Sequence, residues 1–507
     1  MKIPTARADE RRCGVLLHPT ALPGPGPCGT FGHAAADWIR LLGRNGIGVW
    51  QLLPLAPTDG TGSPYSSPSG SALNPALLDG TLLLEEGAIE ADRSAWGADG
   101  LGPELLRCWP RQSPIHQKAF ARWRRTEAFW LRDHCRFMVL RRIHNGEPWW
   151  RWPDRLARRD GRALARLDRE HRPALLQEAL LQWQLQRQWQ RLRQLAREQR
   201  VWVFGDMPFY VAHDSADVWS HPGLFSLNRH GTLRQQSGVP PDYFSATGQL
   251  WGTPVYRWPR HMISGFRWWL QRLGRQLELV DRLRLDHFRA LQAYWSVPGD
   301  SDTAQPGSWQ PSPGWALLAL LWCRCSWRGE LLGAGGHRGR LPLVAEDLGV
   351  ITPEVERLRD GFSLPGMKIL QFAFDGDPGN PYLPSNIRGN DWVVYTGTHD
   401  NATSIGWWHS QDDSVRWRLQ EAIGAPVTAP GWQLLELALA SSADLAVVPL
   451  QDLLELGDEA RFNTPGTTSG NWCWRLDRPI EALAGPLGGF GEMAARYGRG
   501  LGSTPTS

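Results

Sequence analysis

The chain has 507 residues, of which 42% are hydrophobic and 21% charged, a composition typical of a globular protein with a large buried core. Its formal net charge is +4, and this near balance of acids and bases favours neither a nucleic-acid partner nor a membrane surface. The sequence has no apolar stretch of about 18 residues, so we expect no transmembrane helix.

The cysteines and the N-terminal residues indicate in which cellular compartment the protein is expected. Seven cysteines form an odd count, and their spacing fits neither a disulfide framework nor, with the histidines, a zinc site. The segment Met1–Gly14 is charged and lacks the apolar region of a secretory signal. We therefore expect no zinc site and a reducing compartment, either the cytoplasm or an organelle stroma after removal of a transit peptide.

Short runs of apolar and β-branched residues alternate along the chain with helical patterns. Eight runs are of this kind: Cys13–His18, Val49–Leu55, Val201–Asp206, Leu283–Asp286, Leu343–Glu346, Lys368–Phe374, Trp392–Thr396 and Leu445–Leu450. Strands that alternate with helices form parallel sheets, and eight such units predict an α/β fold of the (β/α)₈ TIM-barrel type. An open, doubly wound sheet is the alternative.

Large insertions interrupt this pattern. The interval between the second and third runs far exceeds the roughly 30 residues of a plain barrel unit, so residues 60–200 are predicted to form an inserted, mainly helical subdomain. Its last part, Pro173–Arg200, favours an amphipathic helix packed on the barrel over an RNA-binding face. Further predictions, within one elaborated barrel of residues 1–507, are a second insertion at 207–280, a surface loop at Pro298–Pro313 and a disordered tail at 500–507.

Acidic residues follow three of the predicted strands, at the carboxyl ends where the active sites of such barrels lie. Because residues two apart share a face of a strand, Arg284 and Asp286 can both point into the mouth of the barrel. The fifth run ends in Glu346, and Asp400 follows the seventh. Three converging carboxylates suit cleavage of a glycosidic bond, in which one attacks the anomeric carbon, one protonates the leaving oxygen and one stabilises the positive transition state.

The spacing does not decide which acid has which task. Close packing of carboxylates raises the pKa of one of them, which would suit Glu346 to the acid role. The alternative is structural, since each acid could be an ion-pair partner or could cap a helix. That explanation is weaker for the three acids together than for any one of them.

Long segments of the chain are similar to a known family. They are Ser63–Tyr65, Gly205–Pro208, Asp214–Trp219, Pro240–Ser245, Thr247–Gly252, Arg284–Arg289, Ala345–Gly349, Leu364–Lys368, Gly397–Asn401 and Asn463–Gly466. In this order, and over nearly the whole chain, they resemble the 4-α-glucanotransferases of glycoside hydrolase family 77, also called amylomaltases or disproportionating enzymes.

The resemblance implies a transferase that moves segments of maltooligosaccharides and α-1,4-glucans to the 4-hydroxyl of an acceptor, without a metal or organic cofactor. It implies a retaining mechanism with Asp286 as nucleophile, Glu346 as acid/base and Asp400 as transition-state stabiliser. The substrate-covering loop of the family corresponds to Pro240–Gly252. Its substrate-binding residues fall on Ser63, Tyr65, Asp214, Asp242, Gln249, Trp251, Arg284, His399 and Asn463.

The sequence departs from the family at four loop positions. Thr253 stands where Asn is common, Ala290 where Gly is usual and Ala402 where a second Asp usually follows, and Gln310–Ser312 replaces a stretch that usually carries Lys. None of these changes removes a catalytic carboxylate. Ala402 and Pro311 could alter contacts with the acceptor, although neutral drift in loops explains them equally well.

Other functions have less support. An α-glucan hydrolase would share the barrel and the three acids and would differ in the acceptor, but the covering loop and the family match favour transfer. A catalytically inactive glucan-binding or scaffold protein would not need all three acids. A nucleic-acid-binding protein is disfavoured because acidic residues balance the Arg-rich stretch 141–200 overall.

Overall fold

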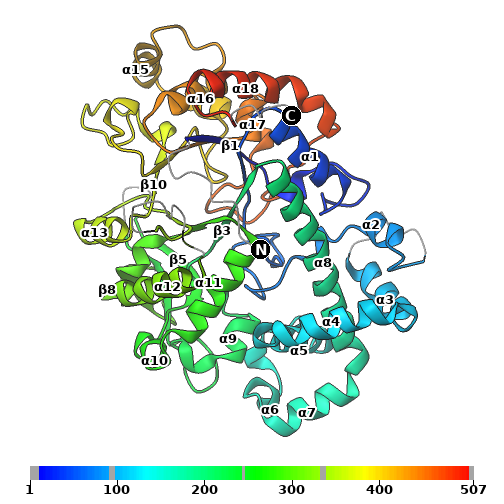
Figure 1. Cartoon of the computed structure of the whole chain (residues 1–507). Helices are drawn as coiled ribbons and strands as arrows, with labels where there is room; N and C mark the ends of the chain where they lie inside the picture. The colour runs from blue at the N-terminus through cyan, green and yellow to red at the C-terminus, as the bar shows by residue number, and fades with distance from the viewer. Residues whose placement is uncertain (1–10, 91–97, 242–245, 330, 332–338, 502–507) are drawn as a thin grey trace.

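The computed structural model describes residues 11–90, 98–241, 246–329, 331 and 339–501, and Figure 1 shows the arrangement of its elements. The main sheet consists of eight strands: β1 (Arg12–Leu16), β2 (Val49–Gln51), β3 (Trp202–Met207), β6 (Arg282–Leu285), β9 (Leu343–Ala345), β10 (Gly366–Ile369), β11 (Trp392–Tyr395) and β12 (Leu445–Pro449). Each overlaps one of the eight runs found in the sequence, although β2 and β10 end earlier than predicted.

All neighbouring strands of this sheet are parallel, in the order β10-β11-β12-β1-β2-β3-β6-β9. The two end strands also meet, because the backbone N–H of Ala345 in β9 donates to the carbonyl oxygen of Pro365, just before β10, at 2.8 Å. This contact closes the sheet on itself. The prediction of a (β/α)₈ barrel is therefore confirmed, and the open sheet is excluded.

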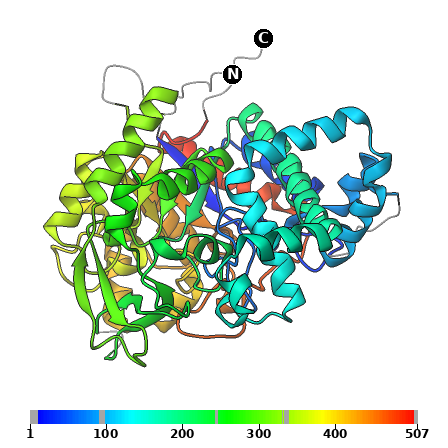
Figure 2. The same cartoon turned by 90° about the horizontal axis from the view of Figure 1, so that it is seen from below.

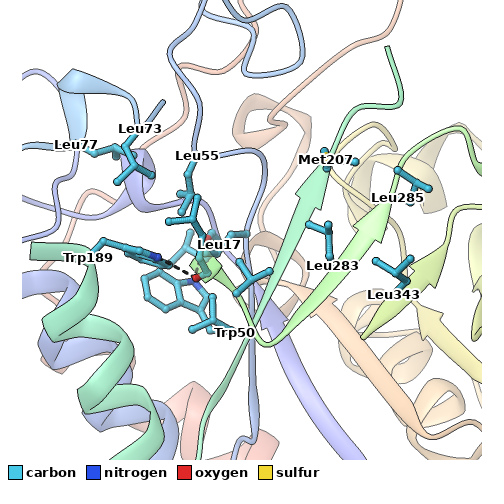
Figure 3. Close-up of a cluster of buried hydrophobic side chains, with 14 of the residues drawn as sticks. Leu17, Trp50, Leu55, Leu73, Leu77, Trp189, Met207, Leu283, Leu285 and Leu343 are labelled. Atoms are coloured by element: carbon cyan, nitrogen blue, oxygen red, sulfur yellow. Dashed lines mark hydrogen bonds between the residues drawn. The ribbon is translucent and has the colours of Figure 1, made fainter. Parts of the chain in front are cut away.

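Side chains along the strands alternate between the interior of the barrel and its outer surface, as the pleat of a strand requires. The interior is filled by a cluster of large apolar residues that includes Leu16, Val49, Phe204, Val344, Met367, Ile369, Val393, Tyr395, Leu445 and Val447. Their strand neighbours, such as Val15, Trp50 and Val203, belong to a second cluster between the sheet and the helices. Figure 3 shows part of this outer cluster, with Trp50 beside Leu17 and Trp189.

Helices cover the outside of the barrel (Figure 1). They are α1 (His33–Arg44), α11 (Arg267–Leu279), α12 (Gly314–Arg328), α13 (Pro353–Gly361), α14 (Ser404–Ser410), α15 (Asp413–Ile423), α16 (Pro430–Ala440), α17 (Leu450–Leu453) and α18 (Ala484–Arg496). The connection between β10 and β11 contains only short 3-10 turns, because Pro378, Pro381 and Pro384 interrupt it. In the part of the chain that the structure describes, no helix is long and apolar enough to cross a membrane.

The segment between β2 and β3 is mainly helical. It forms α2 (Gly80–Glu85), α3 (Ala98–Cys108), α4 (Pro114–Thr126), α5 (Ala128–Ile143), α6 (Asp154–Ala157), α7 (Gly161–Glu170) and α8 (Arg172–Glu198). Figure 2 shows these helices gathered on one side of the barrel. In α8 the Trp189 indole donates to the carbonyl oxygen of Leu279 at 2.9 Å, and Arg193 pairs with Asp281 at 2.8 Å. This helix thus packs on the barrel, as its amphipathic pattern predicted.

Two further insertions, after β3 and β6, combine into a small antiparallel sheet. Its strands are β4 (Gln235–Val239), β5 (Gln249–Pro254), β7 (Ala293–Pro298) and β8 (Ser308–Pro311), in the order β5-β4-β7-β8, and α9 (Ala216–Ser220) and α10 (Trp258–Ile263) flank β4 and β5 in the chain. The prediction of a plain loop at Pro298–Pro313 is therefore wrong in part. Its Pro, Gly and Ser content concealed β8, which pairs with Ala293–Ser296 of β7.

The C-terminal segment runs back to the barrel. The backbone N–H of Leu501 donates to the carbonyl oxygen of Gly46 at 2.9 Å. Leu501 thus lies against the loop between α1 and β2. The rest of the predicted tail, residues 502–507, lies outside the described residues.

Candidate active site

Three acidic residues lie where strands of the barrel end. Asp286 follows β6 directly, Glu346 follows β9 directly, and Asp400 lies in the loop after β11. The carboxyl ends of parallel strands open on the same face of a barrel. The backbone fixes the first two relative to each other, since the Glu346 N–H donates to the carbonyl oxygen of Leu285 at 3.1 Å.

Arg284 links Asp286 to the interior of the barrel. Its guanidinium pairs with Asp286 at 2.9 Å (Nη2 to Oδ1) and with Asp206, at the end of β3, at 2.7 Å (Nη1 to Oδ2). The Asp206 carboxylate also accepts a hydrogen bond from the Tyr65 hydroxyl at 2.7 Å. Only 6% of the Arg284 side chain is exposed, against 31% for Asp286. The Asp286 carboxylate thus faces the mouth of the barrel, with the fixed positive charge of Arg284 behind it.

Both carboxyl oxygens of Glu346 accept hydrogen bonds from the backbone. The N–H of His287 donates to Oε2 at 2.7 Å, and that of Leu348 donates to Oε1 at 3.1 Å. Burial raises the pKa of Glu346 to about 7, and the negative charge of Asp286 acts in the same direction, whereas Arg284 and the two N–H groups oppose them. Glu346 can therefore exchange a proton near neutral pH.

Asp400, in contrast to Glu346, is held in its ionised state. Burial alone would raise its pKa, but the attraction and hydrogen bond of His399, the amide of Asn463 and the charge of Arg284 bring the pKa of Asp400 well below its usual range. Asn463 donates to Oδ1 at 2.6 Å, and His399 Nε2 lies 3.2 Å from Oδ2. Asp400 therefore remains a carboxylate, and with 43% of its side chain exposed it is available to a ligand.

Aromatic rings surround these acids. The ring of Tyr65 stacks on that of His399 with a centroid separation of 5.3 Å and an interplanar angle of 9°. On β5, Trp251 is 36% exposed, and its indole N–H donates to Gln249 Oε1 at 3.3 Å. The same indole meets the ring of His287 edge-to-face at 4.8 Å. These contacts bring Tyr65, Gln249, Trp251, His399 and Asn463, which the family resemblance had singled out, to the acids.

The remaining residues that the resemblance had singled out differ in their positions. Ser63 lies beside Tyr65, whose backbone N–H donates to its hydroxyl at 3.3 Å. Asp214 is not linked to the acids; it accepts a hydrogen bond from the Trp149 N–H at 3.1 Å and lies 3.6 Å from Arg141, between the helical insertion and the barrel. Asp242 lies outside the described residues.

The structure adds three residues to those expected from the sequence. Asp206 shares Arg284 with Asp286, Trp472 lies against both Tyr65 and His399, and His287 contacts Glu346. A signal for Asp206 was present, because it is an acid at the carboxyl end of a strand. Trp472 lies far along the chain, among many other tryptophans, and no pattern marked it.

In the described part of the chain, no group of three or more His, Cys, Asp or Glu side chains could hold a metal ion. The chemistry available to the site is that of its carboxylates, one with a pKa near neutrality and one kept ionised. A (β/α)₈ barrel with such acids at the carboxyl ends of its strands defines an enzyme of the class that cleaves glycosidic bonds by acid–base catalysis.

Comparison with known proteins identifies the family within this class. The family model described as 4-α-glucanotransferase matches residues 17–481. A 4-α-glucanotransferase of Synechocystis sp. is 41% identical over 97% of this chain and 98% of its own, and one of Thermus thermophilus is 43% identical over 92% and 95%. An amylomaltase of Streptococcus agalactiae, solved in complex with acarbose, superposes with a TM-score of 0.89 at 32% identity, covering 97% of this chain and all of that one. The chain belongs to the 4-α-glucanotransferase family and is an enzyme of that activity.

Proposed function

We propose that the enzyme transfers segments of maltooligosaccharides and α-1,4-glucans by a retaining, two-step mechanism. In the first step an oxygen of Asp286 bonds to the anomeric carbon, the glycosidic bond breaks, and Glu346 gives its proton to the departing 4-oxygen. In the second step the Glu346 carboxylate takes the proton of an acceptor 4-hydroxyl, whose oxygen displaces Asp286. Asp400 stabilises the positive charge of both transition states.

The observation that carries this proposal is the difference in environment among the three acids. Glu346 has a pKa of about 7, so that near neutral pH it is protonated in part of the enzyme molecules. It can therefore act as an acid in the first step and, after losing its proton, as a base in the second. Asp286 is paired with Arg284 and faces the opening, as a nucleophile must. Asp400 stays ionised and accepts hydrogen bonds that fix its orientation.

The surrounding polar and aromatic side chains are the proposed glucan contacts. Arg284, His399 and Asn463 adjoin the acids directly and would contact the sugar next to the cleaved bond. Tyr65, beside Ser63, and Trp251, beside Gln249, present rings suited to the apolar faces of glucose units. We retain Asp242 as a candidate from the family resemblance alone. We leave Asp214 out, because its carboxylate is engaged by Trp149 and Arg141.

Transfer competes with hydrolysis at the second step, since water could replace the acceptor. The exposed Trp251 near Glu346 supports transfer, because a bound sugar stacked there would displace water from the intermediate. We also propose that the enzyme acts in the cytoplasm without nucleic-acid partners. Cys13, Cys28, Cys108, Cys135, Cys323 and Cys473 are free thiols, which suits a reducing compartment.

Maltotriose as the sole substrate tests the proposed function. Transfer should give glucose and a ladder of longer maltooligosaccharides while the number of reducing ends stays constant. Asp286→Asn should lower this turnover at least about a thousand-fold, because an amide cannot form the glycosyl ester. Asp302→Asn, at an exposed carboxylate, is the matched control. Reducing ends that rise without longer products would instead mean a hydrolase, and normal transfer by Asp286→Asn would exclude it as the nucleophile.

A further inference from the structure

The loop Asp286–Phe288 surrounds Glu346 with backbone N–H groups. The N–H of His287 donates to Glu346 Oε2 at 2.7 Å, and the next N–H, that of Phe288, donates to the Glu346 carbonyl oxygen at 3.1 Å. Successive N–H groups that converge on one site are typical of backbone in which left- and right-handed conformations alternate. His287 supplies the left-handed member, with φ 51° and ψ 48°, and a 3-10 turn, Phe288–Leu291, follows it.

This conformation is unusual for a residue with a side chain. Left-handed backbone is uncommon outside glycine, and His, Asn and Asp are the side chains that tolerate it best. The ring of His287 is held edge-to-face by Trp251 at 4.8 Å, with Tyr210 at 6.2 Å. Its Nε2 atom is buried and has no hydrogen-bond partner among the described residues. The ring is therefore packed as an aromatic group, and no hydrogen bond of its Nε2 atom explains the strained backbone.

The left-handed backbone of His287 directs two N–H groups to Glu346, its own to the carboxyl group and that of Phe288 to the carbonyl oxygen. We propose that His287 is a positioning residue, whose left-handed backbone holds its N–H on Oε2 of Glu346 and thereby orients the carboxyl group for proton transfer. This inference rests on the proposed role of Glu346 as acid/base. With the Leu348 N–H on Oε1 at 3.1 Å, both oxygens are fixed, and the carboxyl group cannot rotate away from the departing oxygen.

The side chain of His287 takes no part in the proton transfer itself. Burial lowers the pKa of His287 to about 4, so that the ring is neutral where Glu346 exchanges its proton. The charged and titratable groups facing Glu346 are Arg284 and Asp286 from the β6 side and Tyr382 from the segment after β10. Substitution of His287 leaves all three in place, so a change in acid catalysis would report on the orientation of Glu346.

Two substitutions in the full-length enzyme separate backbone geometry from loss of the ring. His287→Val removes the ring and disfavours left-handed backbone, because its side chain is β-branched, whereas His287→Asn removes the ring but tolerates that conformation. Asn145→Val is the control for strain, since Asn145 also has a left-handed backbone (φ 53°) but is exposed in the helical insertion. Each variant is assayed with maltotriose and with α-maltotriosyl fluoride, whose fluoride leaves with little need of a proton. With the fluoride, the rate of fluoride release in the first turnover is measured, because that step precedes the one in which Glu346 acts as a base.

We expect His287→Val to lose at least about ten-fold in kcat on maltotriose and much less on the fluoride. His287→Asn should recover most of the loss on maltotriose, and Asn145→Val should behave as the wild type on both. Equal losses on the two substrates by His287→Val, or losses on maltotriose of the same size in the Asn and Val variants, would overturn the positioning role. Glu346→Gln is assayed in parallel. If Glu346→Gln keeps the fluoride reaction and His287→Val loses it, the positioning role of His287 is excluded and the acid role of Glu346 stands. If Glu346→Gln loses equally on maltotriose and on the fluoride, Glu346 is not the acid.

Discussion

At the scale of single residues, the chemistry of the site depends on what surrounds each carboxylate. Asp286 has a guanidinium beside it, Asp400 has an amide and an imidazole, and Glu346 has two backbone N–H groups in a buried setting. The same functional group is thereby given different affinities for a proton. Strand spacing was enough to locate Asp286, Glu346 and Asp400, but not to distinguish their surroundings.

The pKa of Glu346 leads to a prediction about pH. Because this pKa is raised to about 7, the protonated acid that the proposed first step needs is present below that pH and is lost as the pH rises through it. We expect kcat/KM for maltotriose to fall on the alkaline side with an apparent pKa near 7. Glu346→Gln should lower the rate about 10²–10⁴-fold and abolish this alkaline limb.

The measurement is a pH–rate profile of the wild type and the variant. Glu354→Gln, at an exposed carboxylate in the first turn of α13, is the control and should keep the full profile. An unchanged alkaline limb in Glu346→Gln would assign that limb to another group.

At the scale of elements, α8 shows how the insertion is joined to the barrel. Its hydrophobic pattern predicted a packed helix, and the structure buries Trp189 between the sheet and the helices, beside Trp50 and Leu17 (Figure 3). The strands after β6 were harder to predict. The sequence 298–313 is rich in Pro and Gly, and β8 is a strand only because β7 pairs with it. A local pattern cannot reveal an element that depends on its neighbour.

Truncation of Trp189 tests the importance of this junction. The side chain is 1% exposed and its indole donates to Leu279, so Trp189→Ala should create a cavity and leave a carbonyl group unpaired, at a cost of about 3–5 kcal/mol. We expect the melting temperature, followed by circular dichroism, to fall by several degrees. Trp327→Ala is the matched control, because Trp327 on α12 is 87% exposed. Similar melting temperatures for the two variants would show that α8 is not anchored through Trp189.

At the scale of the whole molecule, the site is assembled from segments distant in sequence. Tyr65 comes from the connection after β2, Asp206 from β3, Arg284 from β6, and His399 and Asn463 from the last third of the chain. The barrel brings them together because all the strands end on one face. The contacts between residues from different strands, such as that of Arg284 with Asp206, therefore depend on assembly of the sheet.

The family resemblance implies no metal or organic cofactor, so we expect the purified enzyme to keep its full activity after dialysis against EDTA. Among the described residues no cluster of ligands could hold a metal ion, and in the proposed mechanism the acids and Arg284 balance the charges that the reaction develops. The assay compares initial rates on maltotriose before and after chelation. A loss that added Mg²⁺ or Ca²⁺ restored would show that a metal takes part.

The sequence by itself determined the eight strands, the positions of the three acids and the family, because apolar runs and the residues that end them are local properties. Only the tertiary structure decided which side chains meet. It linked Asp214 to Trp149 and Arg141, brought Asp206 to Arg284 and Trp472 to His399, and placed the N–H of His287 on Glu346. The physical reason is that protonation and orientation depend on burial and on partners from other strands, which exist only once the barrel has closed.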